Sequence, residues 1–151
     1  MNELQMLLAS ATKDANAWIE GFATYNHLTA TGAVGATLIE LDDDHATLEM
    51  TISNASRQPF GLLHGGVSLM LAESASSLHS AWLADLSQVA PVGVDINGTH
   101  ISSARDGVVH ATARVIRKTR SMIFHEVDVV HVETQRLLCK CRVTNFLKPH
   151  R

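Results

Sequence analysis

One carboxylate stands out in this sequence because it lies inside an apolar helical pattern. The stretch RQPFGLLHGGVSLMLAESASS, residues 57–77, passes from a turn through His-Gly-Gly into a run typical of a helix, and its only acid is Glu73. The positions three and four residues away, which share its face, hold leucine, methionine and serine. Such a glutamate either sits in water at the helix edge or pairs with an arginine, or it is desolvated and serves as a base or nucleophile.

The start of this helix supplies a second candidate group. His64, Gly65 and Gly66 stand where the helical pattern begins, and the first N–H groups of a helix lack intrahelical acceptors and lie at the positive end of its dipole. Glycine lets a ligand approach this backbone closely, so the segment is a candidate oxyanion hole. Gln58 and His64 could donate to the same oxygen. The chain has no Gly-x-Ser-x-Gly motif, so we do not expect a serine hydrolase of that type.

Gly65 and Glu73 cannot both reach one carbonyl group within a single chain. They are eight residues apart in the sequence, which corresponds to about 12 Å along a helix. Two antiparallel copies of the helix, related by a two-fold axis, could bring Gly65 of one chain to Glu73 of the other. If both groups act on one substrate, the sequence therefore predicts a site shared across a homodimer.

The segments around this helix predict an α+β fold. Residues 3–22 have the pattern of an amphipathic helix with Leu4, Leu7, Leu8 and Ala11 on one side, and residues 29–35 are rich in Gly and Thr. A hairpin is expected at 36–53, with a solvated turn at Asp42–Asp44. In its second arm the apolar residues Ala46, Leu48, Met50 and Ile52 alternate with Thr47, Glu49, Thr51 and Ser53, which are expected on the solvent face. The long helix follows at 65–86, and then come four strand-like runs at 89–102, 107–118, 121–133 and 136–147. Short turns favour an antiparallel sheet, which buries one face best by wrapping around the long helix.

Length and composition suit one domain, residues 1–151, in which residues 1–34 form an N-terminal helix and loop. The chain has 151 residues, 46% hydrophobic and 18% charged, with a net charge of -3, so we do not expect a nucleic-acid partner. Without a long apolar run or a signal-peptide pattern, we expect a cytoplasmic protein that does not bind membranes. Cys139 and Cys141 are expected to be reduced core thiols. No zinc-ligand spacing is present, so no metal is predicted.

Three segments carry a resemblance to a known family. QPFGLLHGGVSLMLAES, VGVDINGTHISSARDG and LLCKCRVT resemble the hotdog-fold acyl-CoA thioesterases. The branch that they resemble includes Glu-dependent 4-hydroxybenzoyl-CoA thioesterase and 1,4-dihydroxy-2-naphthoyl-CoA thioesterase. The resemblance covers about residues 35–147. It implies an antiparallel sheet wrapped around one long central helix, and homodimers or homotetramers with sites at the dimer interface. It implies no cofactor, since CoA is part of the substrate.

The resemblance also implies roles for individual residues. Glu73 would attack the thioester or activate water, and the Gly65 N–H would donate to the thioester oxygen. His64 and Gln58 would help to hold and polarise the carbonyl group, and Ser77 would orient the carboxylate or the water. Further residues are expected to bind the acyl group or the CoA nucleotide, and these are Phe60, Leu78, His100, Lys118, Thr119, Arg120 and Ser121.

We therefore predict an acyl-CoA thioesterase that acts on an aromatic or medium-chain acyl group. A thioester carried by a carrier protein stays possible at this point. One alternative is an enoyl thioester hydratase, since Asp95 and His100 have the Asp-x4-His spacing of hydratases of the same fold. Another is a non-catalytic acyl-CoA binding or sensing protein, which would be expected to lack the carboxylate or to carry a DNA-binding segment.

Overall fold

The structure is a computed structural model, and it describes residues 13–150 of the chain. This region contains, in sequence, two short helices, a hairpin, one long helix and four further strands. In chain order they are α2 (Ala15–Asn26), α3 (Ala30–Ala33), β1 (Ala36–Leu41), β2 (His45–Thr51), α4 (Gly65–Leu83), β3 (Val89–His100), β4 (Val108–Lys118), β5 (Met122–His131) and β6 (Arg136–Pro149).

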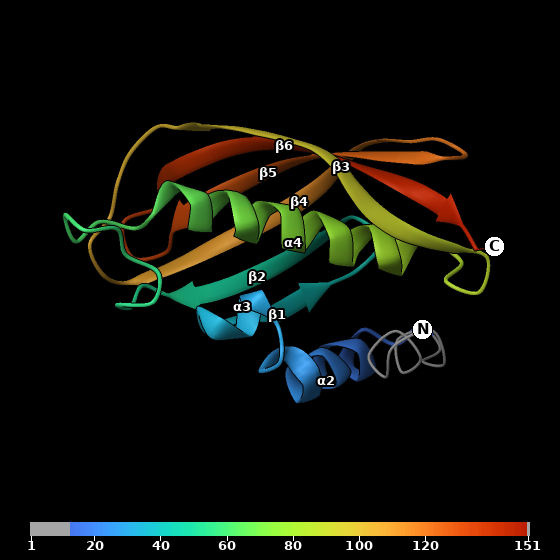
Figure 1. The fold of residues 1–151 in the computed structure, drawn as a ribbon, viewed down its shortest axis with the longest axis horizontal. Helices are drawn as coiled ribbons and strands as arrows, with labels where there is room; N and C mark the ends of the chain where they lie inside the picture. Colours follow the sequence, from blue (N-terminus) through green and yellow to red (C-terminus); the bar gives the residue numbers. More distant parts are fainter. Residues whose placement is uncertain (1–12, 151) are drawn as a thin grey trace.

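The strands of the described region form one six-stranded sheet in the order β1-β2-β4-β5-β6-β3. Every neighbouring pair is antiparallel. The sheet curves around α4, while α2 and α3 lie beside β1 at one edge (Figure 1). This arrangement confirms the predicted α+β hotdog architecture, and it leaves β3 as the edge strand on the other side.

The core lies between α4 and the inner face of the sheet. The predicted alternation in β2 is confirmed for Ala46, Leu48 and Met50, which are at most 1% exposed. Thr47 was expected on the solvent face but is also buried, because its hydroxyl lies 3.0 Å from that of Thr112, its partner on β4. A hydroxyl pair of this kind lets a polar side chain be covered at little cost.

The two cysteines belong to this core. Cys139 and Cys141 are buried free thiols on β6, with their Sγ atoms 3.5 Å apart, which confirms the prediction of reduced core thiols. Burial raises the pKa of the Cys141 thiol to about 12. A Cβ atom at Gly98 of β3 would lie 2.6 Å from Leu69 Cδ2 and 2.9 Å from Cys141 Sγ. The absence of a side chain at Gly98 therefore lets β3 pack closely on α4.

The N-terminal segment differs from the sequence prediction. Helix α2 begins at Ala15 because Asp14 is its N-cap, with a carboxylate that accepts from the N–H groups of Asn16 and Ala17. The helix continues past Phe22 to Asn26, and the Gly- and Thr-rich loop contains the short helix α3. The apolar face predicted for Leu4, Leu7, Leu8 and Ala11 lies outside the described residues. Between residues 13 and 150, no helix is long and apolar enough to cross a membrane.

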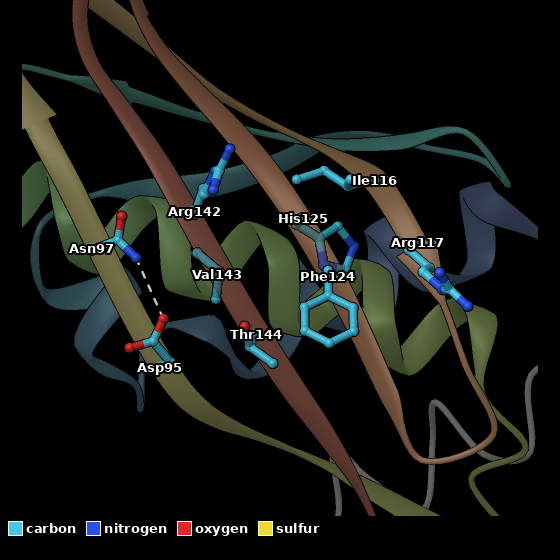
Figure 2. A pocket seen from close by; sticks show the side chains of 9 residues that line it. All are labelled: Asp95, Asn97, Ile116, Arg117, Phe124, His125, Arg142, Val143 and Thr144. Carbon is cyan, nitrogen blue, oxygen red and sulfur yellow. Dashed lines mark hydrogen bonds between the residues drawn. The ribbon is translucent and has the colours of Figure 1, made fainter.

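The outer face of the sheet, on the side away from α4, carries a shallow pocket of about 480 Å³ (Figure 2). Side chains from the four strands β3, β4, β5 and β6 surround it. Asn97 donates to Asp95 at 3.4 Å on β3, and the guanidinium groups of Arg117 and Arg142 stand on β4 and β6. The aromatic ring of Phe124, on the intervening strand β5, lies near Thr144 in Figure 2. The pocket is therefore separated by the sheet from the helix that carries Glu73.

Hydrogen bonds to other groups of the protein hold the aspartates in the turn between β1 and β2. The Asp42 carboxylate accepts from the N–H groups of Asp44 and His45, and Asp43 accepts from the Trp82 indole at 2.8 Å. In the part of the chain that the structure describes, no group of three His, Cys, Asp or Glu side chains is placed to hold a metal.

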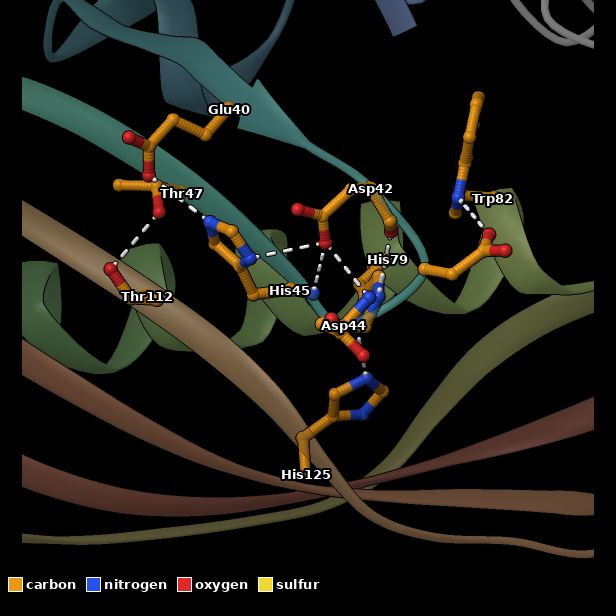
Figure 3. Close-up of polar contacts among 10 residues, drawn as sticks. Glu40, Asp42, Asp44, His45, Thr47, His79, Trp82, Thr112 and His125 are labelled. Carbon is orange, nitrogen blue, oxygen red and sulfur yellow. Dashed lines mark hydrogen bonds and ion pairs between the residues drawn. The ribbon is translucent and has the colours of Figure 1, made fainter. Parts of the chain in front are cut away.

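A pair of histidines is buried beneath this turn (Figure 3). His79 Nε2 lies 3.2 Å from the Asp42 carbonyl oxygen, and His79 Nδ1 lies 3.1 Å from His125 Nε2. A carbonyl group only accepts, so neutral His79 donates through Nε2 and accepts from His125 through Nδ1. Both rings are 0% exposed. Burial, and then repulsion by His79, lowers the pKa of His125 to about 3.

We expect acid to destabilise the fold through this pair. The unfolded chain binds a proton on His125 near pH 6.5, whereas the folded chain binds it only near pH 3. The free energy of unfolding should therefore fall as the pH drops through this window, by up to about 1.4 kcal/mol per pH unit. Chemical denaturation at fixed protein concentration measures it. A His79→Leu/His125→Leu variant should show a shallower dependence, and an equally steep one would contradict the assignment.

Candidate active site

The start of α4 has a free backbone donor. His64 is the N-cap residue, and its Nδ1 accepts from the Gly66 N–H at 2.8 Å. The Gly65 N–H, by contrast, has no acceptor among residues 13–150. Because Nδ1 is occupied as an acceptor, neutral His64 can donate only through Nε2. Gly65 is therefore placed to hold an anionic or partly negative oxygen at the positive end of the helix.

A pocket of about 190 Å³ opens beside this helix start. It brings together three of the predicted site residues, Gln58, Gly65 and His100. A Cβ atom at Gly65 would lie 2.6 Å from His100 Nε2, so the imidazole from the end of β3 packs against the glycine. The remaining lining is mostly aliphatic or small and comes from Leu62, Leu63, Ser68, Ser102, Ser103 and Leu138.

The turn before α4 orients the Gln58 side chain. Its Oε1 accepts from the Phe60 N–H, which leaves the amide Nε2 as the free donor end toward the pocket. Arg105 fixes the same turn by donating to the Phe60 carbonyl oxygen at 3.1 Å. The Phe60 side chain itself is 83% exposed and does not line this pocket in the single chain, so its contact with an acyl group stays a prediction.

Glu73 lies two turns further along α4 and does not meet this pocket within one chain. Its side chain is exposed, and no cation lies within ion-pair distance in the described region. In the isolated chain, Glu73 is therefore a water-exposed carboxylate at the helix edge. A Cβ atom at Gly93 would lie 2.6 Å from Glu73 Oε1. The carboxylate therefore rests on the backbone of β3 at a point that only glycine leaves open.

Ser77, one turn after Glu73, is held by a residue that the sequence analysis did not identify. Its Oγ donates to Asn145 Oδ1 at 3.0 Å. Asn145 is 0% exposed and stands in the inward-facing row of β6, where the alternating neighbours are cysteine, valine and leucine. A single amide in an otherwise apolar row of a strand is the sequence signal that would have revealed it.

The predicted CoA-binding loop, Lys118–Ser121, forms the turn between β4 and β5 at the other end of α4. Lys118 Nζ donates to the carbonyl oxygen of Leu83 at 2.5 Å, and Thr119 Oγ1 accepts from the Met122 N–H. The Lys118, Arg120 and Ser121 side chains are exposed. Leu83 is about 27 Å from Gly65 along the helix. Leu78 is partly buried and packs against the core.

Asp95 and His100 do not form the pair that a hydratase would need. They are five residues apart in one strand, so their side chains project from opposite faces. His100 lines the pocket at the start of α4, whereas Asp95 lines the pocket on the outer face of the sheet. The hydratase alternative therefore loses its proposed acid–base pair.

Comparison with known proteins agrees with this geometry. Residues 60–139 match the thioesterase superfamily. The 1,4-dihydroxy-2-naphthoyl-CoA hydrolase of Listeria monocytogenes is 34% identical over 118 residues, covering 78% of this chain and 94% of that protein. The Escherichia coli protein of the same name is 34% identical over 107 residues, covering 71% of this chain and 77% of that protein.

Solved structures give the same result. A mutant of thioesterase PA1618 from Pseudomonas aeruginosa superposes with a TM-score of 0.84 at 30% identity, covering 87% of this chain and 94% of the other. Thioesterase HI1161 from Haemophilus influenzae gives 0.82 at 30% identity, covering 87% and 90%. With its long helix inside an antiparallel sheet, the chain belongs to the thioesterase superfamily and is a hotdog-fold acyl-CoA thioesterase.

Proposed function

We propose that the protein hydrolyses an aromatic acyl-CoA to the free acid and CoA in a site made by two copies of the chain. The Gly65 N–H of one copy would hold the thioester oxygen, and Glu73 of the other would carry out the chemistry. The observation that carries the proposal is that both groups are free on the same helix, yet about 12 Å apart. Within residues 13–150, the Gly65 N–H has no hydrogen-bond acceptor and the Glu73 side chain is exposed.

The edge strand β3 supports a two-fold arrangement. Among residues 13–150 it pairs only with β6, so its outer edge offers backbone groups that no described strand pairs with. Val92 and Val94 on this strand are 41% and 54% exposed. Pairing of two β3 edges about a two-fold axis would cover these side chains and set the two α4 helices antiparallel. The exposed Glu73, which rests on β3, would then face the helix start of the partner.

The expected reaction follows from the donors at the helix start. Negative charge that develops on the thioester oxygen would be stabilised by the Gly65 N–H and the helix dipole, with Gln58 Nε2 as a further donor. Glu73 of the partner would either attack the carbonyl carbon or remove a proton from water. In both cases the C–S bond then breaks, and the CoA thiolate leaves and takes up a proton. After direct attack, the acyl group is held on Glu73 as a mixed anhydride, which water hydrolyses to release the acid and restore the carboxylate. The exposed cations Lys118 and Arg120 suit the CoA phosphates.

An aromatic acyl group is the substrate class that we favour over a medium-chain aliphatic one. Two relatives are named as 1,4-dihydroxy-2-naphthoyl-CoA hydrolases, and their acyl group is a fused aromatic ring. In this chain the pocket beside Gly65 combines leucine side chains with the flat imidazole of His100. Such a lining offers both apolar contact and a face for ring stacking.

Replacing Glu73 tests the chemical role directly. Glu73→Gln should lower kcat by about 10²–10⁴-fold, because the amide can neither attack nor accept a proton. Thiol release is measured with a panel of aryl- and alkyl-CoA thioesters and one carrier-protein thioester. Glu126→Gln is the matched control, since Glu126 pairs with Lys140 on the outer face of the sheet. A wild type that binds acyl-CoA without releasing thiol would instead indicate a binding protein.

Gly93→Ala should reduce activity without unfolding the protein. The new methyl group would lie 2.6 Å from Glu73 Oε1, and the flexible carboxylate can move aside while the strand stays in place. A displacement of about 1 Å can cost up to about 100-fold in rate. Steady-state kinetics should therefore show a lower kcat with an unchanged melting temperature. Unchanged kinetics would show that the carboxylate does not act from this position.

Complementation tests whether the site is shared. Gly65→Val would block the approach to the backbone donor, since its Cβ would lie 2.6 Å from His100 Nε2, and Glu73→Ala removes the carboxylate. Each variant disables both sites of a dimer and should be inactive alone. Co-refolding the two variants creates mixed dimers with one intact site, so about a quarter of the wild-type activity should return. The same mixture without refolding is the control. No recovery from verified mixed dimers would place the whole site within one chain.

A further inference from the structure

We propose that Asn145 is a positioning residue that fixes the direction of the Ser77 hydroxyl. Ser77 then presents only lone pairs to the active site, so it accepts a hydrogen bond from the reacting water and does not donate one to Glu73. This inference deepens the proposed function and rests on it. It follows from a chain of hydrogen bonds that begins at a backbone carbonyl group.

Asn145 lies directly beneath the reactive turn of α4. It is completely buried on β6, and its Cα partner on β3 is Gly93. Gly93 is the residue on which the Glu73 carboxylate rests. The β3–β6 register therefore places Asn145 against the one turn of α4 that contains Glu73 and Ser77.

The direction of each hydrogen bond can be deduced in order. The Glu73 carbonyl oxygen can only accept, so Ser76 Oγ, at 2.9 Å, donates to it. Ser76 has no second proton, so toward Asn145, at 3.4 Å, it must accept, and the amide Nδ2 faces it. The other end of the amide, Oδ1, therefore faces Ser77, and the Ser77 hydroxyl must donate its only proton to it at 3.0 Å. The main-chain carbonyl group of Glu73 thus determines the direction of every hydrogen bond in this network.

This polarity has a chemical consequence. With its proton committed to Asn145, Ser77 Oγ offers lone pairs on the same helix face as the Glu73 carboxylate, one turn away. A water molecule between two acceptors donates one hydrogen to each, and its own lone pair is then free for the thioester carbon. Glu73 would take one proton as the C–O bond forms, and the thioester π electrons would move to the oxygen held by Gly65. Collapse would expel the CoA thiolate, which receives that proton.

A double-mutant cycle separates this role from a purely structural one. Asn145→Leu keeps the branched shape of the side chain but removes the acceptor for Ser77, and Ser77→Ala removes the hydroxyl. Each should lower kcat by about 10–100-fold with KM changed less than about twofold. Since Asn145 acts through Ser77, the double variant should be no more than about twofold below Ser77→Ala alone. Losses that multiply would overturn the proposal.

Controls make each outcome decisive. Thr47→Val removes another buried hydroxyl contact, the one with Thr112, and should lower the melting temperature with kcat unchanged. If Asn145→Leu fails to fold, Asn145→Ser, which keeps a smaller polar group, takes its place in the cycle. A Ser77→Ala variant with wild-type kcat would overturn the inference while a Glu73→Gln loss left the proposed function intact. If Glu73→Gln kept its activity, the proposed function itself would fail.

Discussion

The packing of α4 into the curved sheet is the constraint on which the other features depend. Small residues on the helix and Gly98 on β3 let the two approach closely, so the helix is held along its whole length. The start of α4 is therefore held against the preceding turn, and the middle of α4 is held against β3 and β6. Because protein interiors are close-packed, neither point can shift without disturbing the other.

Several covered polar side chains are joined in hydrogen-bonded pairs. Hydrogen bonds join the hydroxyls of Thr47 and Thr112 across two strands, the imidazoles of His79 and His125, and the amide of Asn145 with the Ser77 hydroxyl. A buried polar group without a partner costs free energy, so each pair also specifies the register between its elements. Beneath Glu73 the same requirement orients the Ser77 hydroxyl toward Asn145, and in the proposed mechanism this links fold stability to chemistry.

In the proposed mechanism, the single chain carries two half-sites in place of one complete site. The Gly65 N–H, the proposed oxyanion donor, lies beside the Gln58 turn, His64 and His100, whereas the Glu73 carboxylate lies beside Gly93 and the β6 network. A rigid helix keeps these halves about 12 Å apart, so folding alone cannot unite them. An exposed edge strand beside the carboxylate offers the geometry for a second copy to complete each half.

Much of this protein is determined by local sequence patterns. Periodicity predicted the sheet and the long helix, and the His-Gly-Gly segment predicted the free donor at the helix start, because these depend on neighbours in the chain. Position-by-position burial was less predictable, as Thr47 shows, since it depends on the strand beside it. The Asp95–His100 pair, plausible by spacing, is separated by the two faces of one strand. The contacts of Gly93 with Glu73 and of Asn145 with Ser77 join residues far apart in the sequence, so only the tertiary structure could establish them.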